Sequence, residues 1–205
     1  LMRQGKRDRS FFTAMATDIG GVVGPLYRLG DETKGPIREL PSEDASRIVE
    51  TDGESLIGAF WGSYVAIWRS SEGACHILRD PSGAQPCYHT HSAGIDVVCS
   101  AVADIANIPA VHFSVDRDFL AGFLTGHDSI TRHTGLRELW EVLPGERLTL
   151  EPSRPATRCW AWSAPAIGRQ VKRRSFSEAV EEARETVEQC FKGWARHSDN
   201  LIIRL

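Results

Sequence analysis

The chain has 205 residues, of which 41% are hydrophobic and 25% are charged, a composition typical of an ordinary globular protein. Its 24 basic and 27 acidic side chains give a net charge of -3, so no strong positive field favours binding to nucleic acid or an anionic membrane. No apolar stretch approaches the roughly 18 residues of a membrane-spanning helix, and the first residues lack the apolar core of a signal peptide, so a cytoplasmic location is expected.

The first elements are short. The segment 22–29 has an apolar core between glycine-rich turns, which predicts a strand or the arm of a hairpin. The segment LPSEDASRIVETDG, residues 40–53, predicts a short helix with one apolar side and with Ser42 as its N-cap.

The densest pattern runs from residue 56 to residue 100. Apolar, β-prone runs recur there at intervals of about 8 to 12 residues and are separated by turn residues, which is typical of antiparallel strands. The expected strands lie in AFWGSYVAIW, ACHILRD, QPCYHTH and IDVVCS.

The pattern then changes. Two short helices are expected in AVADIANI and VDRDFLAGFLTGH, and LWEVLPGERLTLEP predicts a strand, a Pro-Gly turn and a second strand. Proline, serine and arginine are frequent in 151–174, which predicts a connection between domains.

The last segment predicts the opening of an α/β domain. Ser175 and Glu178 have the spacing of a capping box at the start of an amphipathic helix. A turn and the apolar run LIIRL follow, and such a run is typical of a strand buried on both faces. The predicted organisation is therefore a domain at 1–150, a connection at 151–174 and the start of a second domain at 175–205.

The segment RDPSG, residues 79–83, is a candidate site with a structural alternative. Asp80, Pro81 and Gly83 suit successive positions of a type I turn, so a rigid hairpin corner accounts for the residues without any catalysis. Arg79 is expected to form an ion pair that fixes a neighbouring element.

Cysteines and histidines give further candidates. Cys87, His89, His91 and Cys99 are dense enough for a zinc site, but their spacing matches no common structural zinc site, and exposed histidines explain the pattern better. The five cysteines fit no disulfide framework, and the sequence places no base beside any of them to make a thiolate nucleophile.

The order of these segments resembles the amidotransferase-like half of the asparagine synthetase family. The resemblance covers roughly residues 42–205, and the following segments carry it: Gly58 to Phe60, Arg79 to Gly83, Pro86 to Tyr88, Cys99-Ser100 and Pro144-Gly145. It implies an α+β fold, in which an antiparallel β-sandwich like that of the amino-terminal-nucleophile hydrolases carries flanking helices. The first helix and strand of an α/β ATP-pyrophosphatase domain, the synthetase domain, would follow.

The resemblance also implies a cofactor. In the family, the strand that corresponds to LIIRL leads into a loop that holds the pyrophosphate of ATP. Leu205 matches the residue before that loop, which implies that its backbone lies beside the adenine. ATP and Mg²⁺ would be bound mainly by residues beyond Leu205.

The sequence departs from the family members that hydrolyse glutamine. Those members begin Met-Cys-Gly and use the amino-terminal cysteine as nucleophile, whereas this sequence begins Leu-Met-Arg and has its first cysteine at Cys75. We therefore assign no catalytic residue and no metal ligand in this segment. Only Asp44 matches the family aspartate that binds the amine of glutamine, as part of a vestigial glutamine site.

With its degenerate amidotransferase half, this sequence is most similar to the lasso-peptide cyclases. Those enzymes adenylate a carboxylate and form an isopeptide bond within a peptide. The expected partners are a peptide or amino-acid substrate and a protease that processes the leader peptide, with no nucleic acid and no membrane. The alternatives are a glutamine-hydrolysing asparagine synthetase that has lost its amino terminus, an enzyme like β-lactam synthetase, and a non-catalytic module that docks a peptide.

Overall fold

The computed structural model describes residues 12–15, 19–31, 35–126, 131–165, 168 and 175–196. The predicted strand LIIRL, which ends at Leu205, lies outside the described residues. The main elements, in chain order, are β1 (Phe12–Met15), β2 (Gly20–Val23), β3 (Leu26–Arg28), β4 (Glu39–Leu40), α1 (Ser42–Glu50), α2 (Glu54–Ala59), β5 (Phe60–Gly62), β6 (Val65–Arg69), β7 (Cys75–Arg79), β8 (Tyr88–Ser92), β9 (Ile95–Cys99), α3 (Val102–Ile105), α4 (Arg117–Leu124), β10 (Trp140–Glu141), β11 (Glu146–Leu150), β12 (Thr157–Trp160) and α6 (Phe176–Ala195).

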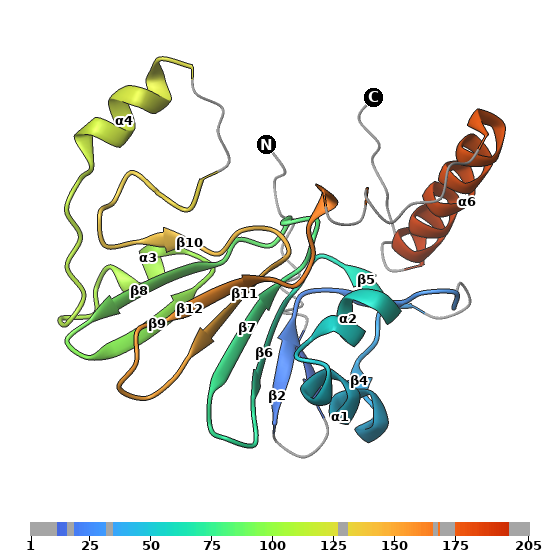
Figure 1. Cartoon of the computed structure of the whole chain (residues 1–205), viewed down its shortest axis with the longest axis horizontal. Coiled ribbons are helices and arrows are strands. Elements are labelled where there is room, and N and C mark those ends of the chain that lie inside the picture. The colour runs from blue at the N-terminus through green and yellow to red at the C-terminus, as the bar shows by residue number, and fades with distance from the viewer. Residues whose placement is uncertain are drawn as a thin grey trace.

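The strands form two main sheets that lie against each other (Figure 1). The larger sheet has seven strands in the order β12-β11-β7-β6-β2-β1-β4, and the smaller has three in the order β10-β8-β9. β4 pairs with β1 in parallel, and the other pairs are antiparallel. β3 and β5 form a separate antiparallel pair.

The alternation of side chains along the central strands divides the interior into two cores. Val65 and Ile67 of β6 pack with Cys87 and other residues between the two sheets. Ala66 and Trp68 of the same strand belong to the core that α1 and α2 cover. Since successive residues of a strand point to opposite faces, this one strand serves both cores.

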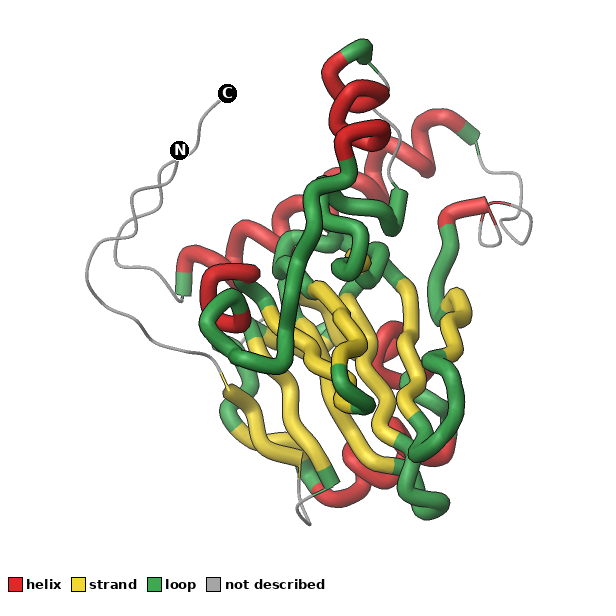
Figure 2. Tube along the Cα trace, turned by 90° about the vertical axis from the view of Figure 1, so that its left-hand side faces the viewer, coloured by secondary structure: helices red, strands yellow, loops and turns green. Residues whose placement is uncertain are grey.

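α1 and α2 cover the outer face of the larger sheet, as Figures 1 and 2 show. α1 buries Ala45 and Ile48 there, and α2 buries Leu56. The result is a mixed α+β fold with several sheets and few helices, compatible with the predicted amidotransferase-like sandwich. The prediction of Ser42 as the N-cap of α1 was wrong, because Ser42 is the first helical residue and Pro41 is the N-cap. No side chain forms a capping hydrogen bond at this end of α1.

The RDPSG segment connects the two sheets. β7 lies in the larger sheet and β8 in the smaller one, so the turn between them is a crossing from layer to layer. The prediction of a hairpin corner was therefore wrong. The hairpins on either side of the crossing, β6–β7 and β8–β9, agree with the strands predicted from the sequence.

The segment predicted as a connection begins with a strand of the larger sheet. β12 pairs with β11 through four residue pairs, from Glu146–Trp160 to Thr149–Thr157. α6 follows, and Ser175 and Glu178 form the predicted capping box. The domain boundaries themselves stay a prediction.

Candidate functional site

A type I turn positions the first part of the candidate site. The amide of Gly83 donates to the carbonyl of Asp80 over 3.1 Å, and Gly83 has a φ of +62°, which favours glycine. The buried Asp80 carboxylate accepts from the amide of Ser82 at 2.8 Å and from the amide of Tyr64 at 3.0 Å. These bonds fix the turn from inside and explain why an aspartate stands there.

Arg79, just before the turn, is 5% exposed and uses its guanidinium to join three segments. It donates to the carbonyls of Gln85, Gly83 and Val142 over 2.6 to 2.8 Å. It also forms an ion pair with Glu141 of β10 at 2.5 Å. The predicted ion pair is thus confirmed, and it ties the larger sheet to the smaller one.

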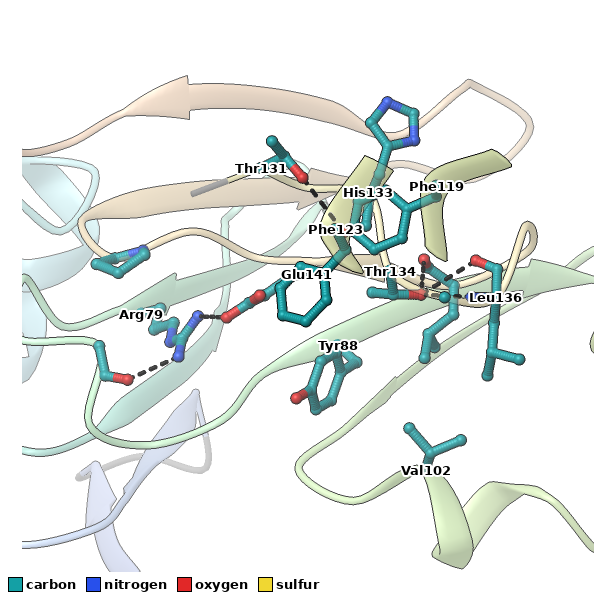
Figure 3. Close-up of a pocket in the computed structure, with 14 residues that line it drawn as sticks. Arg79, Tyr88, Val102, Phe119, Phe123, Thr131, His133, Thr134, Leu136 and Glu141 are labelled. Carbon is teal, nitrogen blue, oxygen red and sulfur yellow. Dashed lines mark hydrogen bonds and ion pairs between the residues drawn. The ribbon is translucent and has the colours of Figure 1, made fainter. Parts of the chain in front are cut away.

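A cavity of ≈ 580 Å³ opens beside this ion pair. Figure 3 shows the rings of Phe119 and Phe123, from α4, facing Tyr88 and the pair formed by Arg79 and Glu141. The cavity therefore combines aromatic walls with one neutralised ion pair. Such a lining is suited to binding a partly apolar ligand.

The threonine hydroxyls of this cavity are already hydrogen-bonded to the backbone. Thr134 Oγ1 donates to the carbonyls of Leu136 and Leu139, each at 3.0 Å, and Thr131 Oγ1 lies 3.3 Å from the carbonyl of His133. No cysteine or serine is among the described residues that line the cavity. The arrangement favours binding over nucleophilic catalysis.

The cavity lies at the end of the larger sheet where β1 begins. Phe12 is opposite Val23, Val23 is opposite Val65, and Val65 is opposite Arg79, so these four residues form one row across the larger sheet. The cavity therefore opens at that end of the sandwich.

Asp44, the predicted vestige of a glutamine site, lies on α1 and is paired within the chain. Its carboxylate forms an ion pair with the guanidinium of Arg28, from β3. The Arg28 guanidinium also lies 4.7 Å from the centre of the Phe60 ring, a cation–π contact. Asp44 does not line the cavity beside Arg79.

The five cysteines form no disulfide bonds, and four of them are buried or partly buried. Burial raises the pKa of the Cys87 thiol to about 12. It also raises the pKa of Cys75, Cys99 and Cys190. A raised pKa opposes formation of the thiolate, which is the nucleophilic form.

The predicted cysteine and histidine cluster is divided by the fold. Cys87 is packed in the core between the sheets, whereas His89 and His91 lie on the next strand, β8, and share the carboxylate of Asp96. Within the described part of the chain, no group of three or more histidine, cysteine or acidic residues is placed to hold a metal ion.

Sequence reasoning missed a second polar network, which is centred on Glu146. Glu146 of β11 is completely buried and is bound by Arg132 and Arg158. The sequence did contain a signal. Glu146, Leu148 and Leu150 alternate along one strand, so the glutamate occupies an inward position and requires a cationic partner.

Leu205, the predicted ATP contact, lies outside the described residues. No helix in the described part of the chain is both long and apolar enough to cross a membrane.

The comparisons with known proteins agree with the architecture. A search of curated proteins found no match. A family model described as a glutamine amidotransferase domain matches residues 42–161, a segment that runs from the start of α1 to the residue after β12. This match covers more than half of the chain and includes the turn, the ion pair between Arg79 and Glu141, the smaller sheet and four strands of the larger sheet. The chain therefore belongs to the glutamine amidotransferase domain family.

Proposed function

We propose that this chain is the amino-terminal part of an ATP-dependent amide ligase related to asparagine synthetase, in which the amidotransferase domain no longer hydrolyses glutamine. Membership of the amidotransferase family supports the first half of the proposal. The ion pair between Asp44 and Arg28 supports the second. The resemblance assigns Asp44 to the amine of glutamine, and here a cation of the chain itself takes that place.

The thiols support the same conclusion. A glutaminase of this family attacks the amide with a thiolate, and burial raises the pKa of four of the five cysteines. The remaining one, Cys159, lies on β12, the edge strand of the larger sheet, and does not line the cavity beside Arg79. The nitrogen of the new amide would therefore come from an amine of the substrate itself.

The substrate class that we propose is a processed peptide with a free amino terminus and an Asp or Glu side chain several residues along, as in lasso-peptide macrocyclisation. ATP with Mg²⁺ would convert the side-chain carboxylate to an acyl-adenylate, and the amine would then displace AMP. The ion would neutralise the charge that builds on the leaving pyrophosphate. Holding the amine and the activated carboxylate together makes the ring closure effectively unimolecular.

The first prediction concerns glutamine. Incubation of the chain with glutamine should release no glutamate above the rate of a buffer blank, because no thiolate is placed to attack the amide. A glutamine-analogue diazoketone should leave the mass of the protein unchanged, whereas iodoacetamide in denaturant should alkylate all five thiols and serve as the control. Stoichiometric labelling of one cysteine by the diazoketone would refute this prediction.

The second prediction concerns the chain extended through its synthetase domain. With ATP and Mg²⁺ it should form AMP and pyrophosphate only when a suitable peptide is present. The product should weigh one water less than the peptide and resist Edman degradation. A matched peptide with Asn or Gln in place of the acidic residue should stay linear.

The alternatives give different results in the same experiment. Formation of asparagine from aspartate and ammonia, with every candidate peptide left linear, would identify an asparagine synthetase. Closure of a small β-amino acid would identify an enzyme like β-lactam synthetase. A docking module would bind peptide and leave ATP intact.

A further inference from the structure

A second cavity, of ≈ 930 Å³, lies between the β8–β9 hairpin and the β11–β12 hairpin. Arg158, Arg154, His89 and His91 contribute its basic groups, and its apolar lining includes Trp140. Arg154 is exposed and already forms an ion pair with Glu151. The amidotransferase chemistry described above does not use this cavity, which is separate from the one beside Arg79. Its volume falls in the range of small-ligand sites.

The buried carboxylate of Glu146, which Arg158 also contacts, has a closer cationic partner in Arg132. Arg132 Nε donates to Glu146 Oε1 at 2.8 Å, and Arg132 Nη2 lies 2.7 Å from the same oxygen. The amide of Leu143 donates to the other oxygen, Oε2, at 2.9 Å. The close contacts of Glu146 therefore come from Arg132 and a backbone amide.

Arg158, by contrast, has only long contacts. Its Nη1 lies 3.4 Å from Glu146 Oε2 and 3.5 Å from the carbonyl of Glu141, and its Nη2 lies 3.2 Å from His89 Nδ1. These distances are at or beyond the long end of ordinary N–H···O bonds. Burial lowers the pKa of Arg158, Glu146 opposes that effect, and nearby Arg132 adds to it. Because the single carboxylate of Glu146 faces both Arg132 and Arg158, it does not compensate the charge of both guanidinium groups.

The tautomer of His89 can be deduced from the same contacts. Arg158 can only donate, so His89 Nδ1 accepts and the ring proton lies on Nε2, which donates to Asp96 at 2.8 Å. His91 Nδ1 lies 3.0 Å from the same Asp96 oxygen. Both histidines thus bind the same oxygen of Asp96. Burial lowers the pKa of His89, which keeps the ring neutral.

We propose that this cavity binds a peptide segment through one of its carboxylates, with Arg158 as the cationic partner and Trp140 as part of the apolar wall. The ligand would supply the close oxygen contacts that Arg158 lacks. The net charge of -3 and the acidic rim residue Glu151 argue against a polyanion such as nucleic acid. The inference does not depend on the ligase reaction, and its test uses no ATP.

The test is a binding measurement on the chain with ¹⁵N-labelled tryptophan. Trp140 lies 6.2 Å from His89 between ring centres, and its indole resonance, assigned with Trp140→Phe, reports on the cavity. The probe is acetyl-Leu-Asp-Ala-amide, and the matched control is acetyl-Leu-Asn-Ala-amide. The aspartyl peptide should shift the Trp140 resonance saturably, and the asparaginyl peptide should bind at least tenfold more weakly.

Variants then identify the cationic partner. Arg158→Gln should weaken the aspartyl peptide at least tenfold, whereas Arg47→Gln, an exposed position on α1, should leave its affinity unchanged. If Arg158→Gln does not fold, the comparison of the two peptides on the unchanged chain still shows whether the cavity recognises a carboxylate. Equal binding of both peptides, or equally tight binding of inorganic phosphate to the same resonance, would overturn the proposal.

Discussion

Arg79 shows what one buried side chain contributes to this fold. Its guanidinium is bonded to three carbonyls and one carboxylate, which come from the turn after β7 and from the segment around β10. A buried arginine with such partners costs desolvation energy, and the fold recovers it only while all the partners are present. Removal of the side chain leaves polar atoms of two segments without a donor.

We predict that Arg79→Met lowers the free energy of unfolding by about 3–5 kcal/mol, because it leaves the Glu141 carboxylate without its cation in a partly buried site. Urea unfolding followed by circular dichroism measures the change. Arg154→Ala is the control, since its ion pair with Glu151 is exposed and should be worth at most about 1 kcal/mol. A loss of similar size in both variants would contradict the expectation.

His89 gives a prediction about acid. Burial lowers the pKa of His89 in the folded chain, so the unfolded chain takes up a proton on this residue at a higher pH, near 6.5. The free energy of unfolding should therefore have its full value above pH 6.5. It should fall as the pH drops toward the lower pKa that His89 has in the folded chain. His76 contributes in the same direction.

The measurement is urea unfolding at intervals between pH 7 and pH 5. His89→Gln should flatten the dependence on pH but not abolish it, because His76 remains. The exposed His112→Gln is the control and should keep the original slope. An unchanged slope in His89→Gln would mean that the ring already carries its proton in the folded chain.

At the scale of the element, α6 is held to the sandwich by a small aromatic cluster. Trp61 stacks on Tyr27 with ring centres 4.3 Å apart, and Trp194 of α6 meets Trp61 edge-on at 6.2 Å. Gly193 permits this approach, because a Cβ there would lie 2.9 Å from the Trp61 ring. The helix contact therefore depends on the absence of one methyl group.

We predict opposite effects for two identical substitutions. Gly193→Ala should destabilise the chain by about 1–3 kcal/mol through overpacking and should weaken the near-ultraviolet circular dichroism of the aromatic cluster. Gly122→Ala, in α4, meets nothing within 4 Å and should stabilise that helix by about 0.5–1 kcal/mol. The same sign in both variants would show that α6 tolerates the added carbon.

Elements were largely predictable from the sequence, but their partners were not. The strands from β6 to β9 and the capping box of α6 follow from local patterns of apolar residues and turn chemistry. The turn at 80–83 reads as a hairpin corner because the same residues suit any tight turn. Only the spacing of the two sheets, which is a tertiary property, decides that the chain crosses between layers there.

At the scale of the whole molecule, the β6 and β7 strands lie between two separate cores. One core is shared with α1 and α2, and the other is shared with the smaller sheet. Composition and periodicity predicted that such strands are buried, but the cavities at the edges of the inter-sheet layer were not predictable. They depend on how strands distant in the sequence meet, as Arg158 of β12 meets His89 of β8.

The strand order also has a consequence for synthesis. Leu78 of β7 is opposite Arg147 of β11, so the edge of β7 has no partner until the ribosome has added 69 further residues (147 minus 78). At about 5–20 residues per second this takes about 3 to 14 seconds. Throughout that interval the nascent chain presents an unpaired, apolar strand edge, which is a surface for aggregation and for chaperone capture. Slower translation between β7 and β11 should therefore lower the yield of folded protein.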